Sequence, residues 1–226
     1  VQTLKAFGLS GCTGVNVATL DETLGLVTLA ENLLQLNLAN VRLGIKFQLP
    51  FFRTIGKHPT MREVNLSSTG LCNSKVLLSC FPAILASRTL QSLELGWNSF
   101  DAEAFEVIGN GLEGNRCLKT LNVSHCSSST MDVTTQSEAP ISVFLERLAH
   151  NTALTKLDVS ENFVDYRAAL VIEDSLQKHR KLTRLALQEN PLGVAGVRCM
   201  IRLLSRDSSG LMELELEGCY EGGGAR

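Results

Sequence analysis

The sequence lacks the motifs that mark most catalytic and metal-binding sites. It contains no phosphate-binding loop, no H-E-x-x-H, no G-x-S-x-G and no C-x-x-C pair. Basic residues are not in excess either, since 21 Lys and Arg oppose 23 Asp and Glu and give a formal net charge of −2. A general nucleic-acid binder needs a basic surface that neutralises phosphates. We therefore expect no enzyme activity, no cofactor and no nucleic-acid partner.

Long apolar runs are also missing. The longest reach about half of the ~20 residues that a membrane-spanning helix needs, and no secretory signal is visible. Seven cysteines are present, an odd number that, without C-x-x-C spacing, disfavours both a zinc site and a disulfide framework. Reduced thiols are ordinary in the cytoplasm. We expect a cytoplasmic protein with no membrane span and no metal.

A repeated pattern occupies nearly the whole chain. The motif L-x-x-L-x-L-x-x-N/C appears eight times, with substitutions in some copies, and its last positions are Cys12, Val41, Thr69, Asn98, Cys126, Asn162, Asn190 and Cys219. These positions are separated by 29, 28, 29, 28, 36, 28 and 29 residues. A fixed period of this size predicts a solenoid of stacked repeats.

The spacing inside each copy predicts a short strand followed by a turn. The second and third apolar residues are two apart, so both point to one side of the strand. The Asn or Cys that follows can donate to backbone carbonyls of neighbouring coils where the chain turns away. Val41 cannot make such bonds and Thr69 can make only some of them. We therefore expect those two turns to be less regular.

Apolar residues at helical spacing lie between the predicted strands. They predict helices at Thr19–Leu29, Pro50–His58, Asp101–Leu112, Pro140–His150, Asp165–His179 and Val194–Ser205, with another near Ser74–Ser87. Asp101 and Asp165 are suited to N-caps, and Pro50 and Pro140 to a first helical turn. Pro82 predicts that its helix starts late or kinks.

Strand, turn and helix units repeated in parallel form a right-handed coil. We predict an α/β horseshoe of about eight β-α repeats, with parallel strands on the concave face and helices on the convex face, as one domain over residues 1–226. The repeat lengths of 28 and 29 resemble the ribonuclease-inhibitor type of leucine-rich repeat, over roughly residues 1–219. This resemblance implies binding of proteins through the concave face or its rims.

Two features depart from a regular solenoid. The chain begins on a repeat and ends just past another without an evident polar cap, so we expect a piece of a longer protein. The 36-residue separation adds about eight residues within the Ser/Thr-rich stretch 127–140. We interpret this stretch as a disordered loop on the rim, with a phosphorylated or partner-binding loop as the alternative.

The concave face is expected to be acidic in its later repeats. Lys156 and Arg184 interrupt a series of carboxylates there, and the alternative is an ordinary solvated face. An acidic surface favours a basic protein partner through electrostatic steering. The candidate partner-binding residues are Glu94, Trp97, His125, Asp158, Glu161, Arg184, Glu189 and Glu215.

Trp97 is the only tryptophan, and it falls where its predicted strand ends. An exposed tryptophan is a frequent interface anchor because it buries a large apolar area with few rotatable bonds. The alternative is that Trp97 packs over a neighbouring coil. His125 takes the equivalent position in the next copy, and we interpret it as a surface residue rather than a metal ligand.

These observations predict a non-catalytic protein-interaction scaffold that is a monomer or part of a larger assembly. One alternative is a GTPase-activating protein resembling the Ran GTPase activator, which has the same type of repeat. Its functional residues cannot be matched to this chain, so none is assigned. The other alternative is a sensor or regulatory region of a larger receptor, or of a cytoskeletal or axonemal protein.

Overall fold

The structure is a computed structural model that describes residues 1–72, 75–128, 138–177, 179–206 and 209–219. Its eight strands form one parallel sheet in chain order: β1 (Ala6–Gly8), β2 (Gln35–Asn37), β3 (Glu63–Asn65), β4 (Ser92–Glu94), β5 (Thr120–Asn122), β6 (Lys156–Asp158), β7 (Arg184–Ala186) and β8 (Glu213–Glu215). The helices between them are α1 (Val17–Leu29), α2 (Ile45–Lys57), α3 (Lys75–Leu85), α4 (Ala102–Gly114), α5 (Ser142–Arg147) with the 3₁₀ turn η1 (Leu148–His150), α6 (Tyr166–Leu176) and α7 (Gly193–Leu204).

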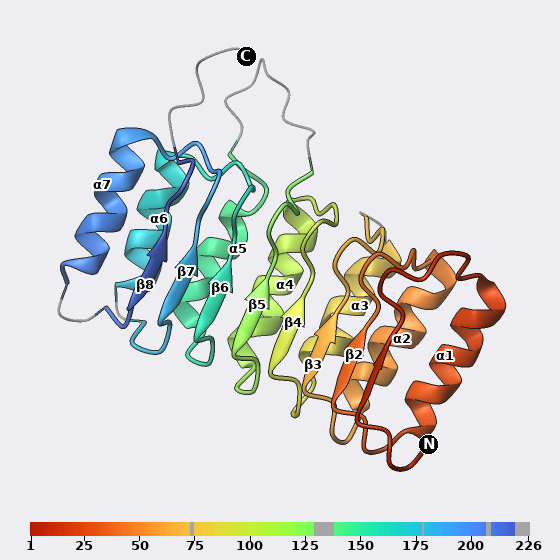
Figure 1. Cartoon of the computed structure of the whole chain (residues 1–226). Helices are drawn as coiled ribbons and strands as arrows, with labels where there is room; N and C mark the ends of the chain where they lie inside the picture. The colour runs from red at the N-terminus through yellow and green to blue at the C-terminus, as the bar shows by residue number, and fades with distance from the viewer. Residues whose placement is uncertain (73–74, 129–137, 178, 207–208, 220–226) are drawn as a thin grey trace.

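The strands lie side by side on one face of the molecule and the helices cover the other (Figure 1). The middle residue of each strand pairs with the middle residue of the next, as Leu121 does with Leu157 and Leu157 with Leu185. These middle side chains point into the core, while their neighbours Lys156 and Asp158 face solvent. The predicted α/β solenoid is confirmed, because the sequence period sets the register of the sheet.

A column of phenylalanines fills the space between sheet and helices in the middle repeats. Phe52, Phe81, Phe100, Phe105 and Phe144 are fully buried, and the centres of consecutive rings are 5.4–6.3 Å apart. Burying one such side chain contributes roughly 1.5–3 kcal/mol. Because each ring contacts the ring of a neighbouring coil, the column joins consecutive repeats.

Pro50 and Pro82 lie inside helices, so Pro50 does not occupy a first turn and the helix that contains Pro82 does not start late. Pro50 is in the middle of α2, and α3 begins at Lys75 and continues through Pro82. Pro140 precedes α5 rather than occupying its first turn. Pro50 and Pro82 are both exposed, so water can replace the hydrogen bond that each proline removes from its helix.

The two predicted N-caps are confirmed. The Asp101 side chain accepts a hydrogen bond from the Ala104 N–H, and the Asp165 side chain accepts from the N–H groups of Arg167 and Ala168. Both caps lie at the end of the turn that leads from a strand to the following helix. They satisfy backbone donors that a helix start otherwise leaves without partners.

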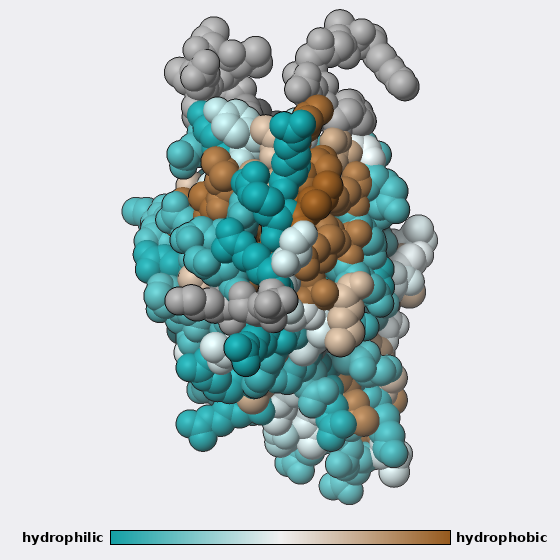
Figure 2. All heavy atoms as spheres, turned by 90° about the vertical axis from the view of Figure 1, so that its left-hand side faces the viewer, coloured by the Kyte–Doolittle hydropathy of each residue, from teal (hydrophilic) through white to brown (hydrophobic). Residues whose placement is uncertain are grey.

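Most of the insertion and the chain's last residues lie outside the described residues, at 129–137 and 220–226. At the last repeat of the solenoid, apolar side chains gather beside α7 and β8 (Figure 2), and Ile201 and Met212 are among the exposed ones. None of the described helices is long and apolar enough to cross a membrane. All seven cysteines are described, and each is a free thiol.

Candidate functional site on the strand face and its exit rim

The exit rim is the edge where the chain leaves each strand and turns toward the next helix. Six non-glycine residues at equivalent places there adopt a left-handed backbone with φ between 49° and 64°: Asn40, Ser68, Trp97, His125, Glu161 and Glu189. Gly11 and Gly218 occupy the same place in the first and last coils. The left-handed conformation costs a non-glycine residue roughly 1 kcal/mol, so the surrounding turn must impose it.

Backbone hydrogen bonds between neighbouring coils hold this row of residues. The N–H of Trp97 donates to the Ser124 carbonyl at 2.9 Å, and the N–H of His125 donates to the Ser160 carbonyl at 2.9 Å. The same bond recurs along the whole row from Asn40 to Glu189. The six side chains are therefore placed at a regular interval along the rim.

Buried asparagines hold the exit-rim turns in place through side-chain hydrogen bonds, as predicted. The Asn162 amide donates to the carbonyls of Val123, Val159 and Ser160 at 2.8–3.1 Å. Its Oδ1 accepts from the backbone N–H groups of Cys126 and Ser127 in the preceding coil. One side chain thus joins two coils, and Asn98 and Asn190 do the same in their own turns.

The prediction that the turns at Val41 and Thr69 are less regular is wrong. Asn40 and Ser68 keep both the left-handed φ and the hydrogen bond to the next coil. The N–H of Val41 donates to the Leu38 carbonyl at 3.0 Å within its own turn. The hydroxyl of Thr69 donates to the Leu66 carbonyl at 2.7 Å. Short local bonds therefore replace those that an asparagine makes.

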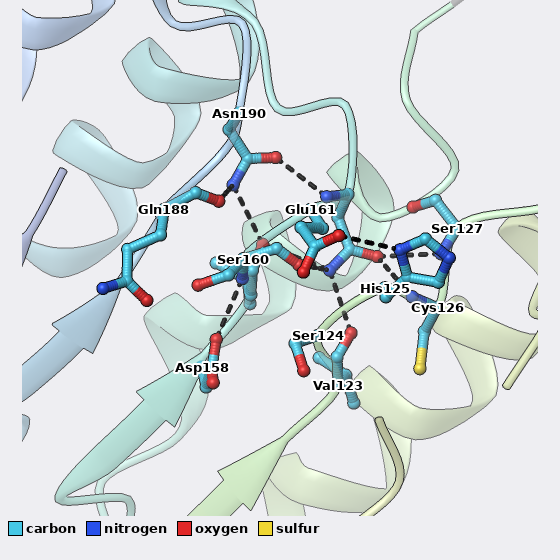
Figure 3. A network of polar contacts seen from close by, with 12 residues as sticks. Val123, Ser124, His125, Cys126, Ser127, Asp158, Ser160, Glu161, Gln188 and Asn190 are labelled. Carbon is cyan, nitrogen blue, oxygen red and sulfur yellow. Dashed lines mark hydrogen bonds and ion pairs between the residues drawn. The ribbon is translucent and has the colours of Figure 1, made fainter. Parts of the chain in front are cut away.

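Three candidate residues from successive coils form a connected row on the exit rim. The rings of Trp97 and His125 are stacked, with centroids 4.1 Å apart and planes 22° from parallel. His125 Nδ1 lies 3.1 Å from Glu161 Oε2, and Figure 3 shows these two side chains facing each other. Trp97 remains 57% exposed. It therefore packs on a neighbouring coil and still presents surface to solvent.

Glu189, the next residue of the row, does not join this group. Its backbone N–H donates to the Glu217 carbonyl, and its carboxylate lies over Gly218 in the last coil. A Cβ at Gly218 would collide with that carboxylate. Glu189 therefore belongs to the rim's far end, one coil beyond the Trp97–His125–Glu161 group.

The remaining four candidates line one hollow of about 200 Å³ on the strand face. Glu94, Asp158, Arg184 and Glu215 surround it together with Thr120, Asn122, Lys156, Leu157 and Ala186. Two guanidinium nitrogens of Arg184 contact the carboxylates of Glu213, at 3.3 Å, and Glu215, at 2.5 Å. Of the two cations that interrupt the acidic series, Arg184 is thus already paired by its own neighbours, whereas Lys156 has no ion pair among the described residues.

Glu94 and Asp158 give the hollow its acidic wall. Partial burial raises the pKa of Glu94, hydrogen bonds from Asn122 and Ser92 oppose this rise, and the nearby Asp158 carboxylate adds to it. Asp158 Oδ1 accepts from the Ser160 N–H at 3.0 Å, which fixes the side chain's orientation. A cationic group in this hollow would relieve the repulsion between the two carboxylates.

Known families and structures match this architecture. A leucine-rich-repeat family model matches residues 86–108 and 114–127, which hold the fourth and fifth copies of the pattern. The structure described as leiomodin-1 actin-binding site 2 aligns with a TM-score of 0.57 at 16% identity, over 73% of this chain and 90% of that chain.

The chain is built from leucine-rich repeats. The structure of the TLR13–ssRNA13 complex also aligns, with a TM-score of 0.54 at 14% identity, over 96% of this chain and 30% of that chain. At these identities both alignments show a shared fold. The resemblance stated from the repeat is confirmed at the level of the leucine-rich repeat.

A second surface of this leucine-rich-repeat protein was not predicted from the sequence. The start rim is the opposite edge, where helices end and strands begin, and Arg62, Arg88, Arg116 and Lys119 lie on it. Each basic residue is two positions before or one position after the first apolar residue of a copy. The signal in the sequence is this recurrence of basic residues at the start of consecutive copies.

No group of three or more His, Cys, Asp or Glu side chains suited to a metal ion occurs in the described ranges. Two histidines, His58 and His179, are instead buried on the start rim. The His58 Nδ1 accepts from the backbone N–H groups of Thr60 and Met61 at 3.3 and 3.1 Å. Their role is to satisfy backbone donors in the turn.

Proposed function

We propose that this leucine-rich-repeat protein is a non-catalytic scaffold that binds a basic segment of a protein partner across β4–β8 and the adjacent exit rim. The supporting observation is that an exposed row of two stacked rings and a carboxylate, Trp97–His125–Glu161, runs along the edge of the sheet that carries an acidic hollow. A basic segment lying across the strands could place one cation in the hollow and another group against Trp97.

Charge supports the choice of a basic partner. Arg184 is paired with Glu213 and Glu215, so it adds little repulsion toward an approaching cation. Glu94, Asp158 and Glu161 remain directed at the hollow or the rim. Complementary charge of this kind raises the association rate and selects against acidic partners.

Trp97 supports an anchor on the same partner. Its neighbour on one side is the stacked His125, and on the other side the row continues with the small Ser68. A guanidinium or ammonium group over an indole ring gains roughly 0.5–2 kcal/mol depending on how far it is desolvated. An arginine-containing segment therefore fits both the rim and the hollow.

The test uses the single tryptophan as its reporter. We expect a short arginine-rich peptide to change Trp97 fluorescence in a saturable way, with weaker binding at high salt because exposed charges are screened. Trp97→Ala, followed by calorimetry, should weaken binding about tenfold, as for an interface anchor. The double variant Glu94→Gln, Asp158→Asn should weaken it about threefold to tenfold.

Glu22→Gln provides the matched control, since Glu22 is an exposed carboxylate on α1, a helix of the opposite face. It should bind the peptide as the wild type does. A single-stranded RNA should not change Trp97 fluorescence, because its phosphates oppose the acidic hollow. Equal peptide binding by the wild type and all three variants, or a saturable change of Trp97 fluorescence on adding the RNA, would contradict the proposal.

The proposal also covers the repeat type, the number of domains, the oligomeric state and the cellular location of the protein. We infer a ribonuclease-inhibitor type of repeat from the 28 and 29 residue spacing, and one domain from the unbroken sheet β1–β8. The seven free thiols, of which Cys12 and Cys72 are exposed, fit a reducing cytoplasm. Sedimentation of the purified chain should give a monomer, and cell fractionation should recover it with cytoplasmic proteins.

A further inference from the structure

Two adjoining hollows lie on the start rim, at the lower edge of Figure 1, between the ends of α3 and α4 and the loops that lead to β3, β4 and β5. Their volumes are about 580 and 380 Å³. Arg88 and Cys117 line both hollows, so the two lie side by side along the rim. We call the two together the start-rim groove.

The walls of the start-rim groove are basic. Arg62, Arg88, Arg116 and Lys119 line it, and the described lining residues include no Asp or Glu. The Arg116 guanidinium donates to the Thr152 hydroxyl at 2.8 Å, and Lys119 Nζ donates to backbone carbonyls at 3.3–3.4 Å. Among the described residues no ion pair engages any of these four cations, so all of them keep charge to offer a ligand.

The floor of the larger hollow is apolar. Pro82, Leu85 and Ala86 of the α3 end face Gly111 and Gly114 of α4 across it. A Cβ at Gly111 would lie 2.6 Å from a methyl carbon of Leu85, whereas a Cβ at Gly114 would meet nothing within 4 Å. Gly111 therefore lets Leu85 pack close against α4, and Gly114 leaves an open space that an aliphatic side chain can fill.

The helix dipole explains part of this arrangement. Cations are favoured near the C-termini of helices, where the dipole is negative, and α3 and α4 both end at this rim. That effect accounts for basic residues at the ends of single helices. It does not require an apolar floor, nor does it bring Arg62 at the start of β3 and Lys119 at the start of β5 to the same groove.

We propose that the start-rim groove binds an acidic peptide segment of a protein partner, with an aliphatic side chain on the floor and carboxylates against the four cations. The groove is opposite in charge to the hollow on the strand face, so it takes a different class of ligand. The inference does not depend on the function proposed above, since neither its residues nor its ligand are shared.

The probe is a short synthetic peptide in which glutamates alternate with leucines, and its affinity is measured by fluorescence anisotropy. We expect saturable binding by the wild-type chain that weakens with salt. Replacing the glutamates with glutamines, or the leucines with serines, should each weaken binding about tenfold or more, because the groove offers both charge and apolar surface.

Cys117 reports where the peptide binds. Its thiol donates to the Arg88 carbonyl inside the groove, while Cys12 and Cys72 are exposed elsewhere in the same chain. Bound peptide should slow alkylation of Cys117 at least about threefold, as judged for each cysteine by mass spectrometry, at a concentration well above its Kd. Alkylation of Cys12 and Cys72 should be unchanged.

Two variants test the groove without disturbing its surroundings. Gly114→Leu places a side chain in the open space and should weaken peptide binding about tenfold. Arg88→Gln removes one exposed cation and should weaken binding about twofold to fivefold. Their matched controls are Gly25→Leu, at an exposed glycine of α1 that also has free space, and Arg198→Gln, at an exposed position of α7.

Several results would overturn the inference. They are a lack of peptide binding by the wild type, unchanged binding by Gly114→Leu and Arg88→Gln, and protection of all three cysteines alike. Inorganic phosphate that displaces the peptide at similar concentration would identify a simple anion site instead. Self-association that both variants abolish would identify a second copy of this chain as the ligand.

Discussion

On both rims of the solenoid, buried side chains satisfy backbone hydrogen-bonding groups of the turns, but the residue types and the bonds differ between the two rims. On the exit rim, Asn98, Asn162 and Asn190 both donate to carbonyls and accept from N–H groups of a neighbouring coil. On the start rim, the buried side chains of His58, Ser87, Asn115, Asn151 and His179 occupy equivalent places and accept from N–H groups of their own turn.

The difference explains which residue types each rim tolerates. An acceptor for N–H groups within one turn can be an imidazole nitrogen, a hydroxyl or an amide oxygen, so the start rim varies in sequence. The exit-rim asparagine donates to several carbonyls in two coils and accepts from two N–H groups, and an amide combines two donor hydrogens with such an acceptor, whereas an imidazole or a hydroxyl has one donor hydrogen. Where the exit rim lacks an amide, at Val41, the backbone closes the turn by itself. The exit rim is therefore recognisable in sequence, and the start rim is not.

The largest expected effect comes from breaking the exit-rim bonds. Asn162→Ala would remove the bonds to two coils and leave buried backbone groups without partners, at a cost of about 3 kcal/mol or more in the free energy of unfolding. Asn151→Ala on the start rim should cost less, because the Asn151 amide makes only one bond outside its own turn. Urea unfolding of both variants measures the difference.

Equal losses of unfolding free energy in Asn162→Ala and Asn151→Ala would show that hydrogen bonds between coils contribute no additional stability. A suitable reference is Asn110→Ala, at an exposed position in α4, which should change the free energy of unfolding by less than about 0.5 kcal/mol.

Acid is expected to lower the stability by a smaller amount, through the two buried histidines of the start rim. Burial lowers the pKa of His58 and His179 from 6.5. Since the folded state then binds fewer protons than the unfolded chain, stability is fully present above about pH 6.5 and falls as the pH drops below it. Protonation of His58 Nδ1 would also remove the acceptor for Met61 N–H. Urea midpoints at about pH 7.5 and about pH 5.5 give the comparison.

His58→Asn separates this effect from general acid sensitivity. Asn115 shows that an amide at the equivalent place makes the same bonds: it accepts from two backbone N–H groups and donates to the Leu85 carbonyl. The variant should therefore remain folded and lose part of the pH dependence. An unchanged difference between the two midpoints would assign the pH dependence to other groups.

The smallest expected effect concerns the left-handed backbone of the exit rim. Ser68→Gly relieves the steric cost of φ 56° and should raise the free energy of unfolding by about 0.5 kcal/mol, after the extra freedom of glycine in the unfolded chain is subtracted. Ser68→Ala keeps a Cβ and should give no gain. Thermal unfolding of the two variants, measured side by side, would contradict this account of the rim if alanine stabilised as much as glycine.

Helix positions were predictable where caps and apolar spacing agreed, as at Asp101 and Asp165. They were misjudged at Pro50, because a local rule places proline in a first turn, whereas an exposed position on the outer side of α2 tolerates it in the interior. The repeat also identified the strand face on which Glu94 and Asp158 line one hollow. The repeat predicted that Trp97 and His125 lie in neighbouring coils, but it did not predict that their rings stack.

The sequence by itself determined the fold of this protein. In a parallel sheet whose strands follow one another in order, residues one repeat apart must be neighbours, so the spacing of the leucines fixes the register. The tertiary structure alone decided which side chains meet on the two rims. The left-handed turn aims Trp97, His125 and Glu161 along one edge, and the ends of α3 and α4 bring Arg62, Arg88 and Lys119 around one groove. Those directions depend on φ, on helix ends and on packing between coils, none of which a repeat length specifies.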